Sequence, residues 1–186
     1  MVGRNSAESV AYFMLTLIPA RFSVVVLFVV ACFVSVAMGT SVGTITLLVP
    51  IAAAVSSASD FDLAFCVASV MGGAMFGDNL SFISDTTIAA CNGQGCEMKD
   101  KFRENFWIAF PAAVATLVII LILSFQTEIQ GHISQDYHLL QVLPYILVLI
   151  GGIIGINVFV VLLTGIVSGA IIMLAGGHIT PVELLT

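Results

Sequence analysis

The stretch that decides the fold is Leu63 to Cys91, LAFCVASVMGGAMFGDNLSFISDTTIAAC. It is an apolar run long enough to cross a bilayer, and polar residues interrupt it between Gly77 and Asp85. The interruption contains two aspartates, Asp78 and Asp85, and a charged side chain at membrane depth costs at least about 2.5 kcal/mol on insertion scales. Such residues persist where they line a cavity or bind something. The stretch therefore predicts a membrane helix that is broken at a functional site.

Composition places this run in a membrane protein. Of 186 residues, 60% are hydrophobic and only 9% are charged, whereas a soluble domain carries about 25% charged residues. The mean hydropathy of +1.16 and the net charge of −6 exclude an ordinary soluble enzyme and a nucleic-acid binder. At roughly 20 residues per apolar helix, we expect an all-α, polytopic membrane protein whose partner is the lipid bilayer, with residues 1–186 forming one transmembrane domain.

The remaining segments give the expected number of spans. Residues 1–21 predict an interfacial or partial helix, Phe22–Ser57 is an apolar run interrupted at 39–44, and Phe106–Phe125 reads as an uninterrupted helix. The run Gln141–Ala175 would measure about 52 Å as one straight helix, so it predicts two short spans that turn near 155–157. If each interrupted run crosses once, the chain has about five spans, two of them discontinuous helices.

Charge placement then predicts the orientation. In a five-span layout all five Lys and Arg residues fall on one face of the membrane, and five acidic residues fall on the other. Because cytoplasmic loops carry the excess of Lys and Arg, residues 92–105 are predicted to be a cytoplasmic connector.

The first interruption carries oxygen ligands for a hard cation. Asp78, Ser81 and Asp85 stand at i, i+3 and i+7, which would place them on one helical face. Further oxygen donors in the run are Asn79, Ser84, Thr86 and Thr87. Carboxylate and hydroxyl oxygens without a resident Lys or Arg suit a monovalent ion or a proton, whereas a soft metal prefers thiolate or imidazole. We therefore expect Asp78 and Asp85 to bind a monovalent cation or a proton. The alternative, two helix-capping aspartates at a kink, does not explain the density of polar residues between them.

The second interruption, GTSVGT at 39–44, supports two interpretations. A broken helix exposes backbone carbonyl and N–H groups that can hold ions, with Thr40, Ser41 and Thr44 adding side-chain oxygens. Alternatively, Gly39 and Gly43 form a GxxxG pair for close helix packing.

No Ser-His-Asp, zinc or phosphate-loop pattern is present in the sequence, so no enzyme site and no cofactor are predicted. Four cysteines without CxxC spacing are interpreted as small buried hydrophobes: Cys32, Cys66, Cys91 and Cys96.

Three motifs resemble one family of transporters. GDNLSFISDTT (77–87) resembles the GD-x-x-S-P-x-SDTT signature of the NhaC family of Na⁺/H⁺ antiporters. GTSVGTITLLVPI (39–51) is similar to the family's GTS-x-GT…P motif, and QGCEMKDKFRENF resembles the connector that follows the signature. The resemblance implies secondary active exchange of Na⁺ for H⁺ across a bacterial inner membrane, with the transported ions as substrates and no cofactor. By motif position it implies a site made of Asp78, Asn79, Ser81, Ser84, Asp85, Thr86 and Thr87, followed by Thr40, Ser41 and Thr44. Asp85 is the first choice for the carboxylate that Na⁺ and H⁺ occupy alternately, and Asp78 is the second.

The chain departs from the family pattern in two respects. Phe82 stands where the pattern often has proline, so a proline-imposed break after Ser81 is not expected. Family members are also considerably longer, so this chain resembles the later part of such a transporter, which a homodimer or missing N-terminal helices would complete. Two other functions stay open: a Na⁺- or H⁺-coupled exchanger of a small organic acid or amine, and an inert fragment or non-transporting membrane subunit.

Overall fold

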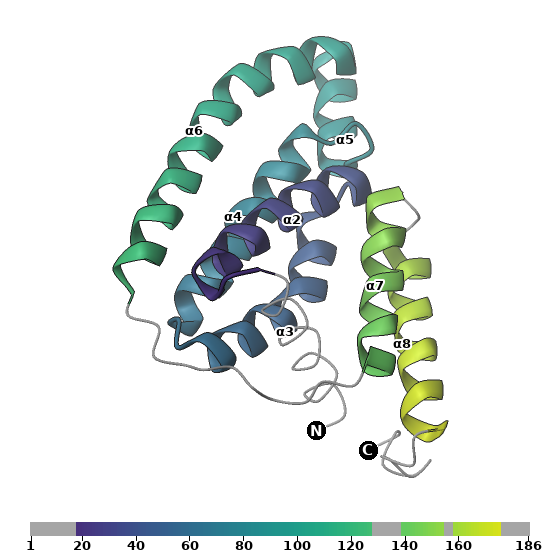
Figure 1. Ribbon diagram of the computed structural model, residues 1–186. Helices are drawn as coiled ribbons and strands as arrows, with labels where there is room; N and C mark the ends of the chain where they lie inside the picture. Colours follow the sequence, from purple (N-terminus) through teal and green to yellow (C-terminus); the bar gives the residue numbers. More distant parts are fainter. Residues whose placement is uncertain (1–17, 128–138, 155–157, 176–186) are drawn as a thin grey trace.

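The computed structural model describes residues 18–127, 139–154 and 158–175, and these residues form helices without strands (Figure 1). In chain order the helices are the 3₁₀ helix η1 (Ala20–Phe22), α2 (Ser23–Met38), α3 (Ser41–Ser59), α4 (Leu63–Leu80), α5 (Asp85–Gln94), α6 (Met98–Gln126), α7 (Leu139–Ile154) and α8 (Val158–Ala175). The predicted all-α architecture is confirmed. Most of the predicted interfacial or partial helix at 1–21 lies outside the described residues.

Among the described residues, four stretches are long and apolar enough to cross a membrane. They are Ala20–Met38, Ser41–Ser59, Leu63–Gln94 and Met98–Gln126. The chain is therefore a multi-pass membrane protein. The run 141–175 forms two helices, α7 and α8, as its length predicted, and the residues of the predicted turn at 155–157 lie outside the described part.

The interruption at Gly39 reverses the chain, which corrects the single interrupted crossing expected for 22–57. Gly39 ends α2 in the left-handed conformation (φ +69°) and donates its N–H to the Ser35 carbonyl. Thr40 is extended, and its side chain accepts a hydrogen bond from the Gly43 N–H, which begins α3. α3 consequently runs back alongside α2, and each helix is long enough to span by itself (Figure 1). The sequence shows an interruption at this point, but not whether the chain continues forward or turns back.

The reversal also separates the basic residues that were expected on one face. The Arg21 carbonyl accepts a hydrogen bond from Ser124, near the end of α6. Lys101 lies in the first turn of the same helix, which is 29 residues and therefore about 43 Å long. Arg21 and the basic residues that begin α6 thus lie at opposite ends of the bundle, and Arg4 lies outside the described residues. Within 92–105, α5 ends at Gln94 and α6 begins at Met98, so only 95–97 connect helices. The cytoplasmic location of this segment stays a prediction.

α2 and α4 run parallel and pack closely because α4 presents glycines to α2. A Cβ on Gly73 would lie 2.4 Å from the Phe28 carbonyl oxygen, and a Cβ on Gly77 would lie 2.4 Å from the Cys32 carbonyl oxygen. Ser35 Oγ adds a hydrogen bond of 2.5 Å to the Ala74 carbonyl. Small residues allow this approach of two backbones, as is common between membrane helices.

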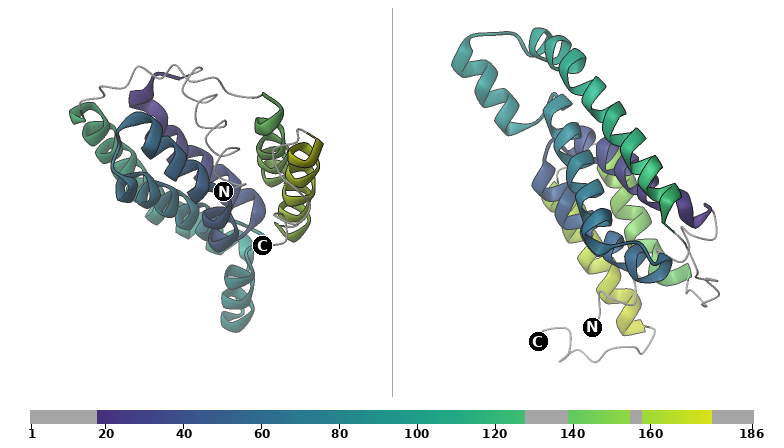
Figure 2. Two further views of the ribbon diagram at one scale, coloured as in Figure 1. Left: turned by 90° about the horizontal axis from the view of Figure 1, so that it is seen from below. Right: turned by 90° about the vertical axis from the view of Figure 1, so that its left-hand side faces the viewer.

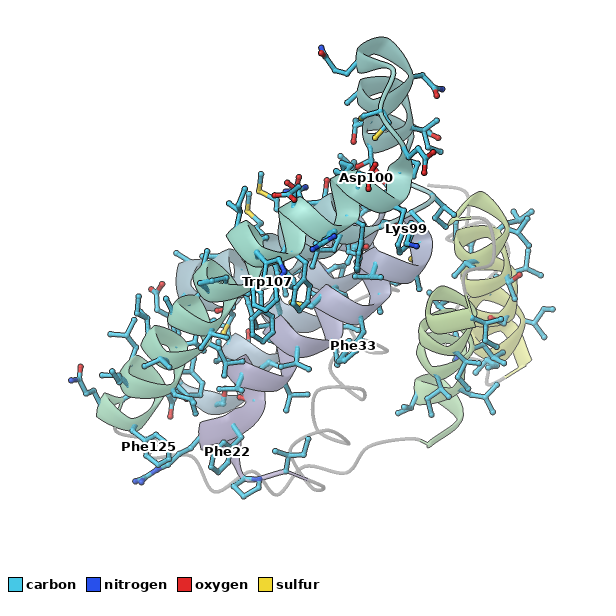
Figure 3. The ribbon with its side chains drawn as sticks, turned by 90° about the horizontal axis from the view of Figure 1, so that it is seen from above. Phe22, Phe33, Lys99, Asp100, Trp107 and Phe125 are labelled. Atoms are coloured by element: carbon cyan, nitrogen blue, oxygen red, sulfur yellow. The ribbon has the colours of Figure 1, made fainter. Side chains whose placement is uncertain are left out.

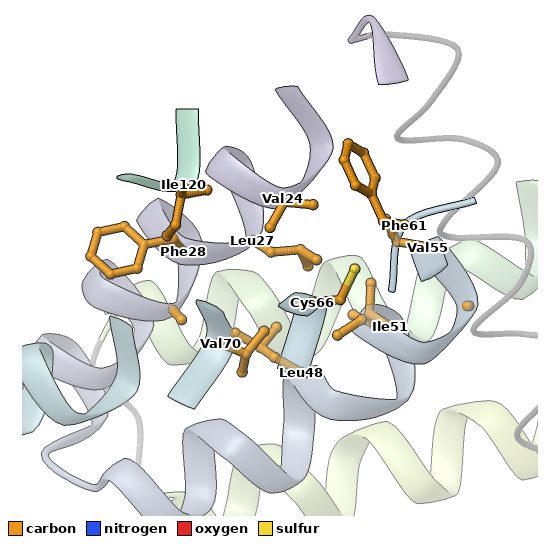
Figure 4. Packing of buried hydrophobic residues seen from close by; sticks show 13 residues of the cluster. Val24, Leu27, Phe28, Leu48, Ile51, Val55, Phe61, Cys66, Val70 and Ile120 are labelled. Carbon is orange, nitrogen blue, oxygen red and sulfur yellow. The ribbon is translucent and has the colours of Figure 1, made fainter. Parts of the chain in front are cut away.

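The hydrophobic core lies between α2, α3 and α4, and α6 closes one side of it (Figure 4). The buried side chains shown there include Val24, Leu27 and Phe28 from α2, Leu48, Ile51 and Val55 from α3, Cys66 and Val70 from α4, and Ile120 from α6. Elsewhere α6 faces outward, with Trp107 70% exposed (Figure 3). An apolar helix with so little of its surface buried is expected to face lipid.

Candidate ion-binding site

The two interruptions of the sequence meet in space. A Cβ on Gly39 would lie 2.7 Å from Cγ1 of Ile83 and 2.9 Å from the Ile83 carbonyl carbon, so the end of α2 lies directly against the α4–α5 break. Ser81 Oγ, in the same break, donates a 2.8 Å hydrogen bond to the carbonyl of Val36 in the last turn of α2. The end of α2, the start of α3 and the end of α4 therefore converge on one region.

Asp78 lies at this junction. Ser41, the first residue of α3, donates a 2.9 Å hydrogen bond from Oγ to Asp78 Oδ2. The carboxylate thus lies by the N-terminus of α3, where free N–H groups carry partial positive charge. The other oxygen, Oδ1, is buried and has no hydrogen-bond partner among the described residues. An unpaired buried carboxylate oxygen is costly, and it is suited to bind a proton or a cation.

The helix breaks after Leu80 although proline is absent. Ser81 adopts an extended conformation, and its Oγ accepts a 3.3 Å hydrogen bond from the Ile83 N–H, so the side chain replaces a helical backbone contact. Phe82 is exposed and stacks on Phe102 of α6 with ring centroids 4.5 Å apart. The departure from the family pattern at Phe82 therefore leaves the break intact.

Asp85 occupies a different environment from Asp78. It is exposed and is the first residue of α5, where the helix dipole favours a carboxylate. Because α4 ends at Leu80 and a new helix begins at Asp85, the expected common helical face for Asp78, Ser81 and Asp85 does not form. α5 also projects away from the other helices (Figure 2).

The remaining predicted ligands bond mainly to nearby groups. Asn79 is exposed, and its Nδ2 donates to the Met75 carbonyl. Ser84 Oγ and Thr86 Oγ1 are 2.9 Å apart, with either as donor. Thr40 caps α3, and Thr44 Oγ1 donates to the Thr40 carbonyl. Of the candidates in the second interruption, Ser41 is the one whose described hydrogen bond reaches Asp78.

Lys101 is a residue of this region that sequence reasoning missed. Its Nζ donates to the backbone carbonyl of Asn79 and, at 3.0 Å, to Oγ1 of Thr87. Asn105 Nδ2 also donates to the Asn79 carbonyl, at 3.2 Å. α6 therefore supplies a cation and an amide to the carbonyl end of α4, where positive charge is favourable. Lys101 stands among three basic residues of one segment, and their spacing alone does not single it out.

The donor set at the junction consists of oxygen atoms and helix ends. Among the described residues, no group of three or more His, Cys, Asp or Glu side chains could hold a metal ion. What the junction provides is one carboxylate, a hydroxyl and the ends of broken helices. Such oxygen donors match a hard monovalent cation or a proton better than a soft metal.

Contact between the two breaks can be tested at Gly39. Gly39→Ala should lower the free energy of unfolding by about 3 kcal/mol, because the left-handed conformation costs about 1 kcal/mol for alanine and the new Cβ also overpacks Ile83. Gly95→Ala is the matched control, since Gly95 has a φ of +66° but open space around its Cβ. Thermal unfolding in detergent should show a larger loss of stability for Gly39→Ala than for Gly95→Ala. Equal losses would mean that Gly39 does not contact the break.

The role of Lys101 can be measured by hydrogen exchange. Lys101→Met should remove its charged hydrogen bonds to the α4–α5 region, each worth about 1.5 kcal/mol. Amides of residues 81–88 should then exchange about tenfold faster. Lys99→Met, at an exposed position in the same helical turn (Figure 3), should leave the exchange rate unchanged. Equal effects of the two variants would remove Lys101 from this role.

The fold and the junction together indicate the class of protein. The chain is a multi-pass, all-helical membrane protein with broken helices that meet at a half-buried carboxylate with one buried oxygen, an arrangement from which secondary transporters build ion sites. More particularly, the chain belongs to the Na⁺/H⁺ antiporter family, whose model matches residues 10–127. This confirms the resemblance found in the sequence motifs.

Individual relatives match between about half and two thirds of the chain. An uncharacterized protein of Haemophilus influenzae is 36% identical over 109 residues, which is 58% of this chain and 21% of the relative. The Na⁺/H⁺ antiporter NhaC of Alkalihalophilus pseudofirmus is 26% identical over 64% of this chain and 26% of its own length. The malate-2H⁺/Na⁺-lactate antiporter of Bacillus subtilis is 28% identical over 52% of this chain and 21% of its own length. The matches thus span about a quarter or less of these relatives, and no solved structure matches the chain.

Proposed function

We propose that the chain is part of a secondary transporter that exchanges Na⁺ for H⁺, and that Asp78 is the carboxylate the two ions occupy alternately. The observation that carries the proposal is the buried, unpartnered Oδ1 of Asp78 at the meeting point of two helix breaks. Membership of the antiporter family supports it independently.

The geometry suggests how the exchange occurs. Ser41, the first residue of α3, holds Oδ2 through its hydroxyl, which leaves Oδ1 for the transported ion. Because a proton and Na⁺ would neutralise the same buried charge, binding of one displaces the other. An occupant of either kind satisfies the orphaned oxygen, so the site favours the occupied states over the empty one. That preference couples the outward movement of one ion to the inward movement of the other.

Asp85 takes a secondary place in this proposal. The sequence made it the first candidate because it follows Ser84 and precedes Thr86 in the signature. Its exposure at the start of α5 suits a group that attracts cations toward the junction rather than one that holds them there. We therefore place Asp78 before Asp85, the reverse of the order expected from the motif.

The surroundings of the transporter follow from the same proposal. A bacterial inner membrane suits a Na⁺/H⁺ antiporter, and lipid would cover the outward apolar face of α6. Since the matches cover 26% and 21% of the two named antiporters, we propose that further helices, or a second copy of this chain, complete the pathway around Asp78.

One specific observation favours a second candidate, exchange of a small organic acid coupled to Na⁺. One relative is a malate-2H⁺/Na⁺-lactate antiporter, and in this chain Lys101 brings a cation to the break from outside the apolar run. A cation beside a helix N-terminus can hold an organic carboxylate.

Transport assays in everted vesicles separate these functions. Vesicles that contain the chain together with the helices, or the second copy, that complete its pathway should dissipate a respiration-generated ΔpH when NaCl is added, and KCl should have no effect. A response that requires lactate or malate in addition to Na⁺ would favour the organic-acid exchanger. No response to any of these additions, with the protein present and folded, would contradict the proposal and favour a non-transporting subunit.

A further inference from the structure

The end of α5 brings two cysteines together that the sequence left as unrelated buried hydrophobes. α5 ends at Gln94 and is capped by Gly95, which is left-handed at φ +66°. The Gly95 N–H donates to the Cys91 carbonyl, and the Cys96 N–H donates to the same carbonyl at 3.1 Å. The second hydrogen bond is the six-residue closure of a Schellman motif, in which the two side chains at its ends normally touch. In this chain the residues at those two positions are Cys91 and Cys96.

The two thiols differ in accessibility. Cys91 is only 2% exposed, whereas Cys96 is exposed in the turn between α5 and α6. Both are free thiols in the structure. An accessible cysteine beside a second thiol that can resolve its oxidised form is the arrangement of a reversible redox site. Cys32 and Cys66 lie in α2 and α4, among the packed transmembrane helices.

We propose that Cys91 and Cys96 form a redox-active dithiol that hydroperoxides oxidise to an intramolecular disulfide. The Cys96 thiolate attacks the terminal oxygen of the peroxide, which breaks the O–O bond and gives a sulfenic acid and an alcohol or water. The Cys91 sulfur then displaces the hydroxyl of the sulfenic acid as water, and the S–S bond forms. The two thiols together lose two electrons, and these electrons reduce one molecule of peroxide.

The disulfide would close a short loop that needs little backbone movement. The hydrogen bond from Cys96 to Cys91 already holds the two backbones together. Because the loop is short, the disulfide removes little chain entropy and should be readily reversed by thiol exchange. The site therefore suits a switch better than a permanent structural bridge. The disulfide would join the end of α5 to the turn that leads into α6, the helix that carries Lys101.

Thiol counting and mass spectrometry test the proposal on the purified chain in detergent. Stoichiometric hydrogen peroxide should remove two reactive thiols, lower the mass by about 2 Da and give a peptide linked through Cys91 and Cys96. Dithiothreitol should restore both thiols. Cys32→Ser and Cys66→Ser should behave as wild type, whereas Cys91→Ser should stop at a sulfenic acid on Cys96 that dimedone traps.

Other results of the same measurements would contradict the proposed dithiol. Peroxide treatment that leaves Cys91 and Cys96 unlinked, or that links Cys96 only to a cysteine of another molecule, would overturn the proposal. So would loss of the linked peptide at a protein concentration low enough to prevent intermolecular contact. These readouts need no transport activity, so they stand or fall separately from the proposed ion exchange.

Discussion

Gly77→Leu is expected to abolish the packing of α2 against α4 and, with it, the folded bundle. A Cβ at position 77 would lie 2.4 Å from the carbonyl oxygen of Cys32 and 2.7 Å from Cβ of Ser35. The neighbours are backbone and a buried residue, so they cannot rotate out of the way. Overpacking in a core typically costs up to about 3 kcal/mol, and a backbone clash of this kind should reach or exceed that value. When the variant is eluted in detergent, the sharp peak of folded protein should be small.

Gly169→Leu is the matched control. Gly169 also lies inside a predicted membrane helix, α8, but a Cβ there would meet no atom of the described residues within 4 Å. This variant should fold and unfold like the wild type in the same detergent. If Gly77→Leu and Gly169→Leu were equally stable, the parallel contact of α2 with α4 would be wrong, and with it the convergence of helix ends at Asp78.

Asp78→Asn is expected to eliminate Na⁺ binding while the fold is kept. Asparagine has nearly the shape of a protonated aspartate, so Ser41 keeps a partner, but no negative charge is left to balance Na⁺. Removing one partner of a buried charge pair costs about 3 to 5 kcal/mol, which corresponds to at least about a hundredfold loss of Na⁺ affinity. Isothermal titration of the purified chain with NaCl measures this loss of Na⁺ affinity directly.

Two further variants define the site around Asp78. Ser41→Ala removes one hydrogen bond to the carboxylate, so Na⁺ affinity should change by about tenfold, the equivalent of about 1.5 kcal/mol. Asp85→Asn should change the affinity less than about threefold because that carboxylate is exposed and screened. A larger loss from Asp85→Asn than from Asp78→Asn would restore the order that the sequence motif suggested.

The sequence was sufficient for those features that depend on local composition. The apolar runs predicted the helices, the split of 141–175 into two helices followed from its length, and the polar residues after Gly77 marked where α4 ends. Asp78 and Asp85 were singled out because charge is scarce in this chain and expensive in a bilayer. The break formed at Ser81 even without proline, because a serine side chain can replace the helical hydrogen bond.

Features that depend on tertiary contact could not be predicted in this way. A glycine in an apolar run is compatible with a kink or with a full reversal, and only the left-handed Gly39 and the packing of α3 against α4 select the reversal. The contact of Gly39 with Ile83 joins two motifs that are far apart along the chain. Lys101 reaches the break from another helix, and the pairing of Cys91 with Cys96 requires the turn at Gly95. Each of these contacts follows from helix ends whose directions the hydrophobic pattern does not encode.

Proton release on addition of Na⁺ tests the central claim most directly. The purified chain in weakly buffered detergent, at a pH where the site carries a proton, should acidify the medium when NaCl is added, and choline chloride should cause no change. Asp78→Asn should release no proton, whereas Asp85→Asn should release as many as the wild type. Equal proton release from Asp78→Asn and wild type, or no release from a folded wild-type chain, would contradict competition of Na⁺ and H⁺ at Asp78.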